Sequence, residues 1–158
     1  DRSVSRGLGD VYKRQGIFPN VSSLAFTNNK LYISSRTKSR IAIIDYSTMG
    51  LITEFTTVNK PLAMLLYDKT LYVLGAQNNE IQKINTTNDQ VIDTIALGTE
   101  GFSSGLNAIE NTNLAVVTDL KNNLYSILDL SKGKLLKTYK LNVPIKSVII
   151  TNKVSLFD

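Results

Sequence analysis

The hydrophobic residues of this chain come in short runs that polar turns separate. The first repeat holds four such runs of four to six residues, at residues 22–26, 31–34, 41–45 and 51–56. Runs this short, rich in Leu, Ile, Val, Tyr and Phe, favour β-strands, because a helix needs about ten residues or more. The Asn, Asp and Gly residues between them accept the tight turns of hairpins. The pattern therefore predicts four antiparallel strands.

The same pattern returns about every forty residues. Residues 31–33 (LYI) return at 71–73 (LYV) and at 114–116 (LAV), offsets of 40 and 43. Residues 41–45 return at 81–85 and 125–129, and residues 51–52 return at 91–92 and 135–136, offsets of 40 and 44. Pro19, Pro61 and Pro144 each precede an apolar stretch. A fixed period of this length decides the fold before any local assignment.

Four antiparallel strands in about forty residues form one blade of a β-propeller. We therefore predict an all-β fold, a β-propeller fragment of about three four-stranded antiparallel blades plus the start of a fourth. The predicted blades span residues 19–60, 61–101 and 102–143, with an incomplete one at 144–158. The apolar run at 62–67 is expected to be buried on both faces. In the outer run, Leu51, Thr53 and Phe55 are expected to face one way and the residues between them the other.

A ring closes with about four to eight blades, so three and a third blades leave edges open. Open edges are sites of strand pairing. We therefore expect the chain by itself to self-associate or to melt without strong cooperativity. A monomer with a sharp two-state melt would contradict this expectation.

Residues 78–98 (NNEIQKINTTNDQVIDTIALG) resemble the YVTN-type β-propeller repeat, and residues 71–73 match the start of its name motif. The resemblance covers residues 19–158. It implies a multi-bladed propeller of the bacterial cell envelope, periplasmic, surface-bound or secreted, and many such proteins have no demonstrated catalysis. The third repeat also resembles a WD repeat, with Asp129 and Gly133-Lys134 before the outer strand, but the chain contains no Trp or His.

Residues 4–15 (VSRGLGDVYKRQ) resemble translated sequencing-adaptor read-through. Residues 1–15 show no sustained period of 2 or 3.6, so we interpret them as a non-native, disordered segment and residues 16–158 as a partial propeller domain. The alternative is a genuine basic tail. Without residues 1–15, which hold four basic and two acidic residues, 14 basic and 11 acidic residues remain, a net charge of +3. This balance does not call for nucleic acid as a partner.

The composition excludes several kinds of chemistry. The chain has no His and no Cys, so it holds no Ser-His-Asp triad, no Cys nucleophile, no imidazole or thiolate zinc site and no disulfide. We predict no catalytic residue, no metal and no cofactor. No apolar run approaches the ~20 residues of a membrane-spanning helix, so no transmembrane segment is predicted.

Candidate ligand residues lie in the loops that follow the second strand of each blade and in the linkers between blades, since function in rigid scaffolds usually sits in loops. The first loop holds three cations in five positions, which suits an anion; a solvated loop is the alternative that we favour. The polar loops of the other repeats suit a peptide or glycan, with ordinary turn chemistry as the favoured alternative. The predicted residues are Arg36, Lys38, Arg40, Gln77, Asn79, Glu100, Lys121 and Asn123.

Glu100 belongs to the glycine-rich segment 98–105, where close backbone approach to a ligand is possible. A single carboxylate is a weak calcium signal, so a blade linker is the favoured interpretation. Asp45, Asn85 and Asp129 recur at one position of the repeat. We interpret them as caps of the Ser/Thr turn that follows each of them.

These observations favour a non-catalytic binding or scaffold propeller of the bacterial cell envelope, with a protein, peptide or glycan ligand on the loop face. One alternative is a cytosolic protein-interaction scaffold of the WD-repeat class. Another is part of an enzyme whose catalytic residues lie in further blades.

Overall fold

The computed structural model describes residues 19–98 and 103–143, which form three four-stranded antiparallel sheets. In each sheet the strands follow one another in chain order, so each sheet is a meander. Blade 1 contains β1 (Val21–Thr27), β2 (Lys30–Ser35), β3 (Arg40–Asp45) and β4 (Leu51–Thr56). Blade 2 contains β5 (Pro61–Tyr67), β6 (Thr70–Gly75), β7 (Glu80–Asn85) and β8 (Gln90–Ala96). Blade 3 contains β9 (Ser103–Ala108), β10 (Leu114–Asp119), β11 (Leu124–Asp129) and β12 (Lys134–Lys140).

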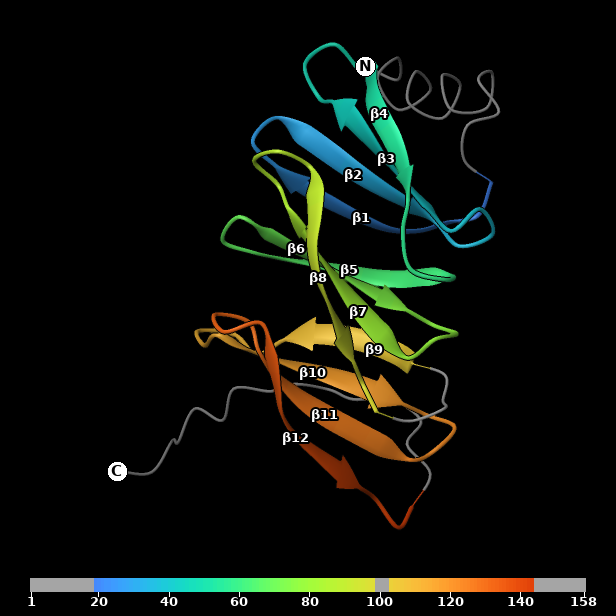
Figure 1. Ribbon diagram of the computed structural model, residues 1–158, viewed down its shortest axis with the longest axis vertical. Helices are drawn as coiled ribbons and strands as arrows, with labels where there is room; N and C mark the ends of the chain where they lie inside the picture. Colours follow the sequence, from blue (N-terminus) through green and yellow to red (C-terminus); the bar gives the residue numbers. More distant parts are fainter. Residues whose placement is uncertain (1–18, 99–102, 144–158) are drawn as a thin grey trace, which may run out of the picture.

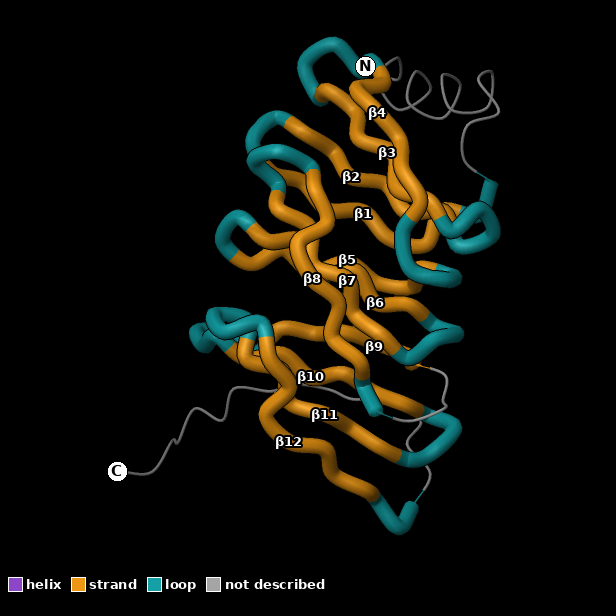
Figure 2. Tube along the Cα trace, viewed as in Figure 1, coloured by secondary structure: helices purple, strands orange, loops and turns teal. Residues whose placement is uncertain are grey.

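The three blades stack in chain order along the long axis of the molecule (Figure 1). The first strands of the blades lie together, because β1 packs against β5 and β5 packs against β9. Within the described ranges only strands, turns and loops occur (Figure 2), and no helix there is long and apolar enough to cross a membrane. The all-β propeller architecture predicted from the repeat is therefore confirmed.

The middle blade is held by two apolar cores, one on each of its faces. Successive side chains of a strand point to opposite faces, and β6 carries apolar residues on both. Leu71 and Val73 belong to the core shared with blade 1. Tyr72 and Leu74 belong to the core shared with blade 3. All four side chains are at most 1% exposed, so the packing between blades depends on alternate residues of one strand.

The expectation that residues 62–67 are buried on both faces holds only in part, because these residues pack against both cores but are not fully buried. Pro61 is buried, but the other residues of β5 are only half-buried. The physical reason is position, because β5 is an edge strand of its sheet. Full burial on both faces is found in β6, which has a strand on each side and a blade against each face.

The pairing register corrects the alignment of the third repeat by one residue. Leu71 pairs with Ile84, whereas Ala115 pairs with Leu128, so Ala115 and not Leu114 corresponds to Leu71. The turn between β9 and β10 is longer than the two-residue turn between Tyr67 and Thr70, and this displaces the third repeat. As a result Val116 occupies the position of Tyr72, and the third blade has no tyrosine there.

Each blade has two β-bulges that the alternation of residues does not predict. One follows the first residue of the first strand and the other follows the first one or two residues of the last strand, and both recur in all three blades. In blade 1 the second bulge skips Ile52, because Ile44 pairs with Leu51 and Ile43 with Thr53. Leu51 and Ile52 are consequently both about half exposed, at 45% and 48%. The expected alternation therefore fails at the start of β4.

The proposed adaptor-derived segment 1–15 and the proposed start of a fourth blade at 144–158 lie outside the described residues.

Candidate ligand site on the loop face

One end of the three sheets, here called the loop face, gathers the turns after the second strands and the linkers between blades. The turns span residues 36–39, 76–79 and 120–123. A backbone hydrogen bond of 2.9 Å joins each turn to the first residue after the last strand of the same blade. The three bonds run from Thr57 N to Ser39 O, from Leu97 N to Asn79 O and from Leu141 N to Asn123 O. These turns and linkers therefore lie at the same end of the sheets.

The residue that ends each of these turns has a left-handed backbone. Ser39, Asn79 and Asn123 have φ values of 50°, 50° and 55°, and Asn tolerates this conformation better than most residues. Asn79 is also buried, with only 4% of the residue exposed. Its Oδ1 accepts a hydrogen bond from the Ser103 hydroxyl of blade 3. Turn geometry and interblade contact thus account for Asn79, and a ligand role for Asn79 and Asn123 stays a prediction.

The three cations of the first turn differ in their surroundings. Arg40 is the first residue of β3, and its Nη1 lies 2.5 Å from Glu54 Oε1 on β4. Arg36 and Lys38 are exposed in the turn itself. Within residues 19–98 and 103–143, neither of their charged groups makes a hydrogen bond or an ion pair. Two cations of the loop face are thus available to an anion and the third is already paired.

Arg36 borders an open cleft between blades 1 and 2 with a volume of about 460 Å³. The cleft has two hydroxyl groups, from Ser22 and Thr37, and apolar walls. Ser22 Oγ donates to Pro61 O at 2.6 Å and Thr37 Oγ1 donates to Pro19 O at 3.2 Å, so protein acceptors fix both hydroxyls. The lining residues are Asn20, Val21, Ser22, Arg36, Thr37 and Leu62. This arrangement offers one exposed cation beside a partly apolar wall.

The other predicted residues do not join this cleft. Gln77 and Lys121 are exposed in the turns of blades 2 and 3, and Glu100 lies outside the described residues. No group of three carboxylates that would suit a metal ion occurs in the part of the chain that the structure describes. Of the predicted residues, the structure therefore brings only Arg36 to this cleft among those it describes, and Lys38 lies in the same turn outside the cleft lining.

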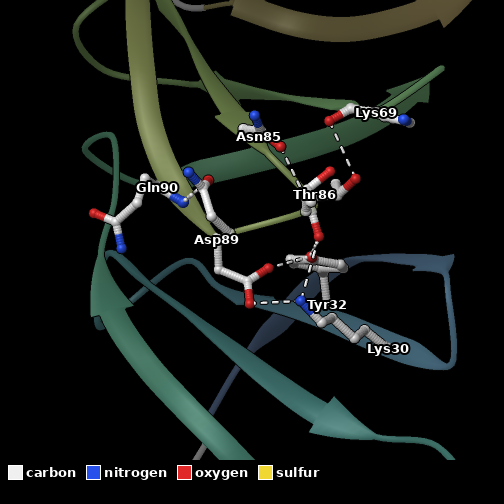
Figure 3. Close-up of polar contacts among 9 residues, drawn as sticks. Lys30, Tyr32, Lys69, Asn85, Thr86, Asp89 and Gln90 are labelled. Carbon is white, nitrogen blue, oxygen red and sulfur yellow. Dashed lines mark hydrogen bonds and ion pairs between the residues drawn. The ribbon is translucent and has the colours of Figure 1, made fainter.

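A second polar cluster, which the sequence did not indicate, joins blades 1 and 2 away from the loop face (Figure 3). Asp89, in the turn between β7 and β8, receives a hydrogen bond of 2.5 Å from the Tyr32 hydroxyl and an ion pair of 2.7 Å from Lys30 Nζ. Asp89 has a left-handed φ of 60°. Behind it, Thr86 Oγ1 donates to Lys69 O at 3.1 Å. The cluster fastens the last turn of blade 2 to β2 of blade 1.

A tyrosine hydroxyl also joins blade 2 to blade 3, here through a single hydrogen bond. The Tyr72 hydroxyl donates to Leu130 O at 2.6 Å, and Tyr72 occupies the position of Tyr32 in the repeat. Burial raises the pKa of both tyrosines, and the Asp89 carboxylate raises that of Tyr32 further. Both hydroxyls therefore keep their protons and act as donors. The recurrence of Tyr at residues 32 and 72 was the one sequence signal for this contact.

The predicted capping by the recurring Asp and Asn is confirmed. Asp45 Oδ1 accepts from Ser47 N at 2.8 Å, Asn85 Oδ1 from Thr87 N at 2.8 Å and Asp129 Oδ1 from Ser131 Oγ at 2.7 Å. The hydrogen bond from Ser131 is the largest cause that holds the pKa of Asp129 below its usual range, and Ser47 has the same effect on the pKa of Asp45. These residues therefore hold their turns together.

Comparison with protein-family models finds no match, and comparison with curated proteins finds none either. Several solved structures are similar to this chain. Hydrazine synthase of Kuenenia stuttgartiensis aligns with a TM-score of 0.68 and 17% identity over 80% of this chain and 37% of that one. The computationally designed Ika8 protein aligns with a TM-score of 0.67 and 14% identity over 84% of this chain and 40% of that one.

The WD40 repeats of RRP9 align with a TM-score of 0.67 and 13% identity over 79% of this chain and 40% of that one. At these identities the likeness shows the fold alone. The chain spans about two fifths of the length of these structures. Its three sheets are blades of a β-propeller.

Proposed function

We propose that this chain belongs to a non-catalytic binding or scaffold propeller that holds an acidic protein, peptide or glycan on its loop face. The observation that carries the proposal is the cleft beside Arg36. An exposed guanidinium that has no side-chain partner among the described residues, next to fixed hydroxyls and an apolar wall, suits a carboxylate or phosphate group, because Arg binds such groups through paired hydrogen bonds. Lys38, two residues further along the same turn, adds a second positive charge.

We further propose a bacterial protein of the cell envelope, in the periplasm, on the cell surface or secreted. The support for this is the resemblance of residues 78–98 to the YVTN-type repeat. We also propose that residues 1–15 derive from adaptor read-through. A secretory leader upstream in the parent reading frame would support the envelope assignment, and a cytosolic parent protein would contradict it.

The second candidate function is a cytosolic protein-interaction scaffold of the WD-repeat class. The likeness to the WD40 repeats of RRP9 favours it. The two candidates differ in ligand class, since a WD-type scaffold would select folded proteins or peptides and no free glycan. A third candidate, an enzyme with catalytic residues in other blades, predicts turnover that this chain alone does not supply.

The test is binding of the purified chain to two arrays, one of acidic and neutral glycans and one of peptides with and without Asp and Glu. The chain should bind acidic members of one array. The double variant Arg36→Ala, Lys38→Ala should bind at least about tenfold more weakly, since a hydrogen bond to a charged group contributes about 1.5–3 kcal/mol.

The matched control is Lys69→Ala with Lys134→Ala, which also removes two exposed cations but at the opposite end of the sheets. This control should bind like the unmodified chain. Equal loss in both double variants would show attraction to net charge alone and would contradict a site at Arg36. No binding to either array would contradict the proposed ligand classes.

A further inference from the structure

A second open groove lies between blades 1 and 2, along the last strand of blade 1. Its volume is about 370 Å³, within the range of roughly 300–1,000 Å³ that small-ligand sites have. One wall is β4, and the other is the turn between β7 and β8 with the start of β8. Thr53, Phe55 and Thr56 line it from β4, and residues 88–91 line it from the other wall. None of these residues lines the cleft at Arg36, so the groove is a separate site.

Several side chains of the groove have unused capacity for hydrogen bonds. The hydroxyls of Thr53 and Thr56 and the side-chain amide of Gln90 make no hydrogen bond within the described part of the chain. All three residues are exposed. Each hydroxyl can donate and accept, and the amide offers two donors and one acceptor. Figure 3 shows the Gln90 side chain projecting on the side away from Tyr32 and Lys30.

The carboxylate of Asp89 is the one charged group among the described residues that line the groove. Tyr32 donates to one of its oxygens and Lys30 to the other. These two contacts fix the carboxylate and leave further lone pairs on both oxygens. A fixed carboxylate accepts hydrogen bonds from ligand hydroxyls and repels ligand anions. The groove therefore favours an uncharged, hydroxyl-rich ligand, unlike the cleft at Arg36.

Phe55 gives the groove an apolar surface beside these polar groups. Its side chain packs against the core shared by blades 1 and 2, and it is half-buried. The core contact holds the ring, and the part that remains accessible lines the groove. One face of a sugar ring carries C–H groups that pack on an aromatic ring, while the hydroxyls around it need hydrogen-bond partners. The combination of Phe55 with hydroxyl, amide and carboxylate groups thus suits a sugar.

The matching position between blades 2 and 3 is filled by a lysine. By the register Lys83 occupies the position of Ile43, and Gly133 occupies that of Asp89. Lys83 Nζ lies 3.0 Å from Asp93 Oδ2, and the lysine side chain is only 15% exposed. It crosses over Gly133, where an added Cβ would lie 2.5 Å from Nζ. Ile43 is buried in the core instead, so residues specific to the first junction leave its groove open.

We propose that the groove between β4 and the turn after β7 binds a short neutral glycan. Sugar hydroxyls pair with Thr53, Gln90 and Asp89, and a sugar ring packs on Phe55. The volume suits a short ligand and not a folded partner. The site acts independently of the proposed anion site, because the two share no lining residue.

The test is an NMR titration of the full, isotope-labelled chain with the neutral disaccharides maltose, cellobiose and N,N′-diacetylchitobiose. At least one of them should shift the resonances of residues 53–56 and 88–91 and leave those of residues 36–39 unchanged. Because the ligand is uncharged, added salt should not weaken its binding. Thr53→Val and Gln90→Ala should each weaken binding roughly two- to tenfold, the usual effect of losing one neutral hydrogen bond.

The matched control is Thr94→Val, the same change at an exposed threonine of β8 that does not line the groove. This variant should bind like the unmodified chain, and circular dichroism checks that every variant remains folded. Equal weakening by Thr94→Val and Thr53→Val would overturn the proposal. No binding of any of the three disaccharides, shifts confined to residues 36–39, or loss of binding in salt would also overturn it.

A peptide is the other occupant that the titration must exclude. The uncharged peptide Gly-Ser-Gly-Ser, blocked at both ends, offers hydroxyls and amides but no sugar ring. It should cause no shifts at residues 53–56 and 88–91. Shifts there with the peptide and not with the disaccharides would assign the groove to peptides and overturn the proposal.

Discussion

At the residue scale, the end of β6 shows how closely the blade linker approaches the sheet. Gly75 lies under the linker that joins blades 1 and 2, and a Cβ added to it would lie 2.9 Å from Val58 Cβ and 3.3 Å from the Asn59 carbonyl oxygen. These neighbours are a β-branched core residue and backbone, which cannot move far. Gly75→Ala should therefore lower the free energy of unfolding by about 1–3 kcal/mol, measured by urea denaturation.

The same substitution at Gly50 is the control. An added Cβ there meets only the exposed Thr48 hydroxyl, at 3.2 Å, which can rotate away. Gly50→Ala should change stability by less than about 0.5 kcal/mol. An equal cost at the two glycines would contradict the close approach of the linker to β6.

Asp129 should contribute to the acid sensitivity of the fold. Its pKa is lowered in the folded chain, chiefly by the hydrogen bond from Ser131, so it stabilises the fold above the ordinary carboxyl pKa of about 3.9. This contribution is lost as the pH falls below about 4 and through the lower folded value. Asp129→Asn should therefore destabilise the chain at neutral pH and much less in acid, measured as urea midpoints across this pH range.

The variant should still fold, because Asn85 already holds the equivalent turn of blade 2 through an amide oxygen. A difference between Asp129→Asn and the unmodified chain that stays constant from neutral pH to acid would contradict the assigned role of the carboxylate charge.

The sequence predicts the capping residues well and the residues with a left-handed backbone less well. Asn79 and Asn123 are residues that suit a left-handed turn. Met49 and Lys60 have φ values of 56° and 52°, although neither residue type favours this conformation. Their positions follow from the register of the repeat and not from their own preferences, so local propensity could not find them.

At the element scale, the fastening between blades depends on one hydroxyl at a fixed position of the second strand. Tyr72→Phe removes the donor to Leu130 O and leaves a buried carbonyl without its partner. An unsatisfied buried acceptor costs about 1–3 kcal/mol, so we expect a loss of about 1–2 kcal/mol in the free energy of unfolding.

Tyr67→Phe is the matched control, since Tyr67 lies on the neighbouring strand beside the same core. No hydrogen bond of its hydroxyl occurs within the described residues. This variant should cost less than about 0.5 kcal/mol. If both tyrosines tolerated the change equally, the hydrogen bond between Tyr72 and Leu130 would not fasten the two blades.

The strand pattern was predictable because short apolar runs and polar turns mark strands directly. The bulges were not, since a skipped residue such as Ile52 looks like any other apolar residue in the sequence. The one-residue error in aligning the third repeat has a similar cause. The longer turn before Leu114 changes the register, and similarity between LYV and LAV is too weak to reveal it.

At the scale of the whole molecule, the repeat length predicted the blade architecture, and the loop face followed from it. The cleft at Arg36 was only half predictable. The sequence shows three neighbouring cations. It does not show that Arg40 pairs with Glu54, whereas the charged groups of Arg36 and Lys38 have no partner in the part of the chain that the structure describes. The cluster around Asp89 was not predictable, because its members come from different blades, and Lys30 and Asp89 are 59 residues apart.

The central claim is that three blades stack face to face in chain order through two separate cores. The most direct test is a nuclear Overhauser experiment on the chain with labelled Tyr, Thr and Leu. We predict contacts from the Tyr72 ring to Leu130 and from the Tyr32 ring to Thr86, pairs that lie 58 and 54 residues apart. Contacts of both rings with their own sheets alone would contradict the stacking of the blades.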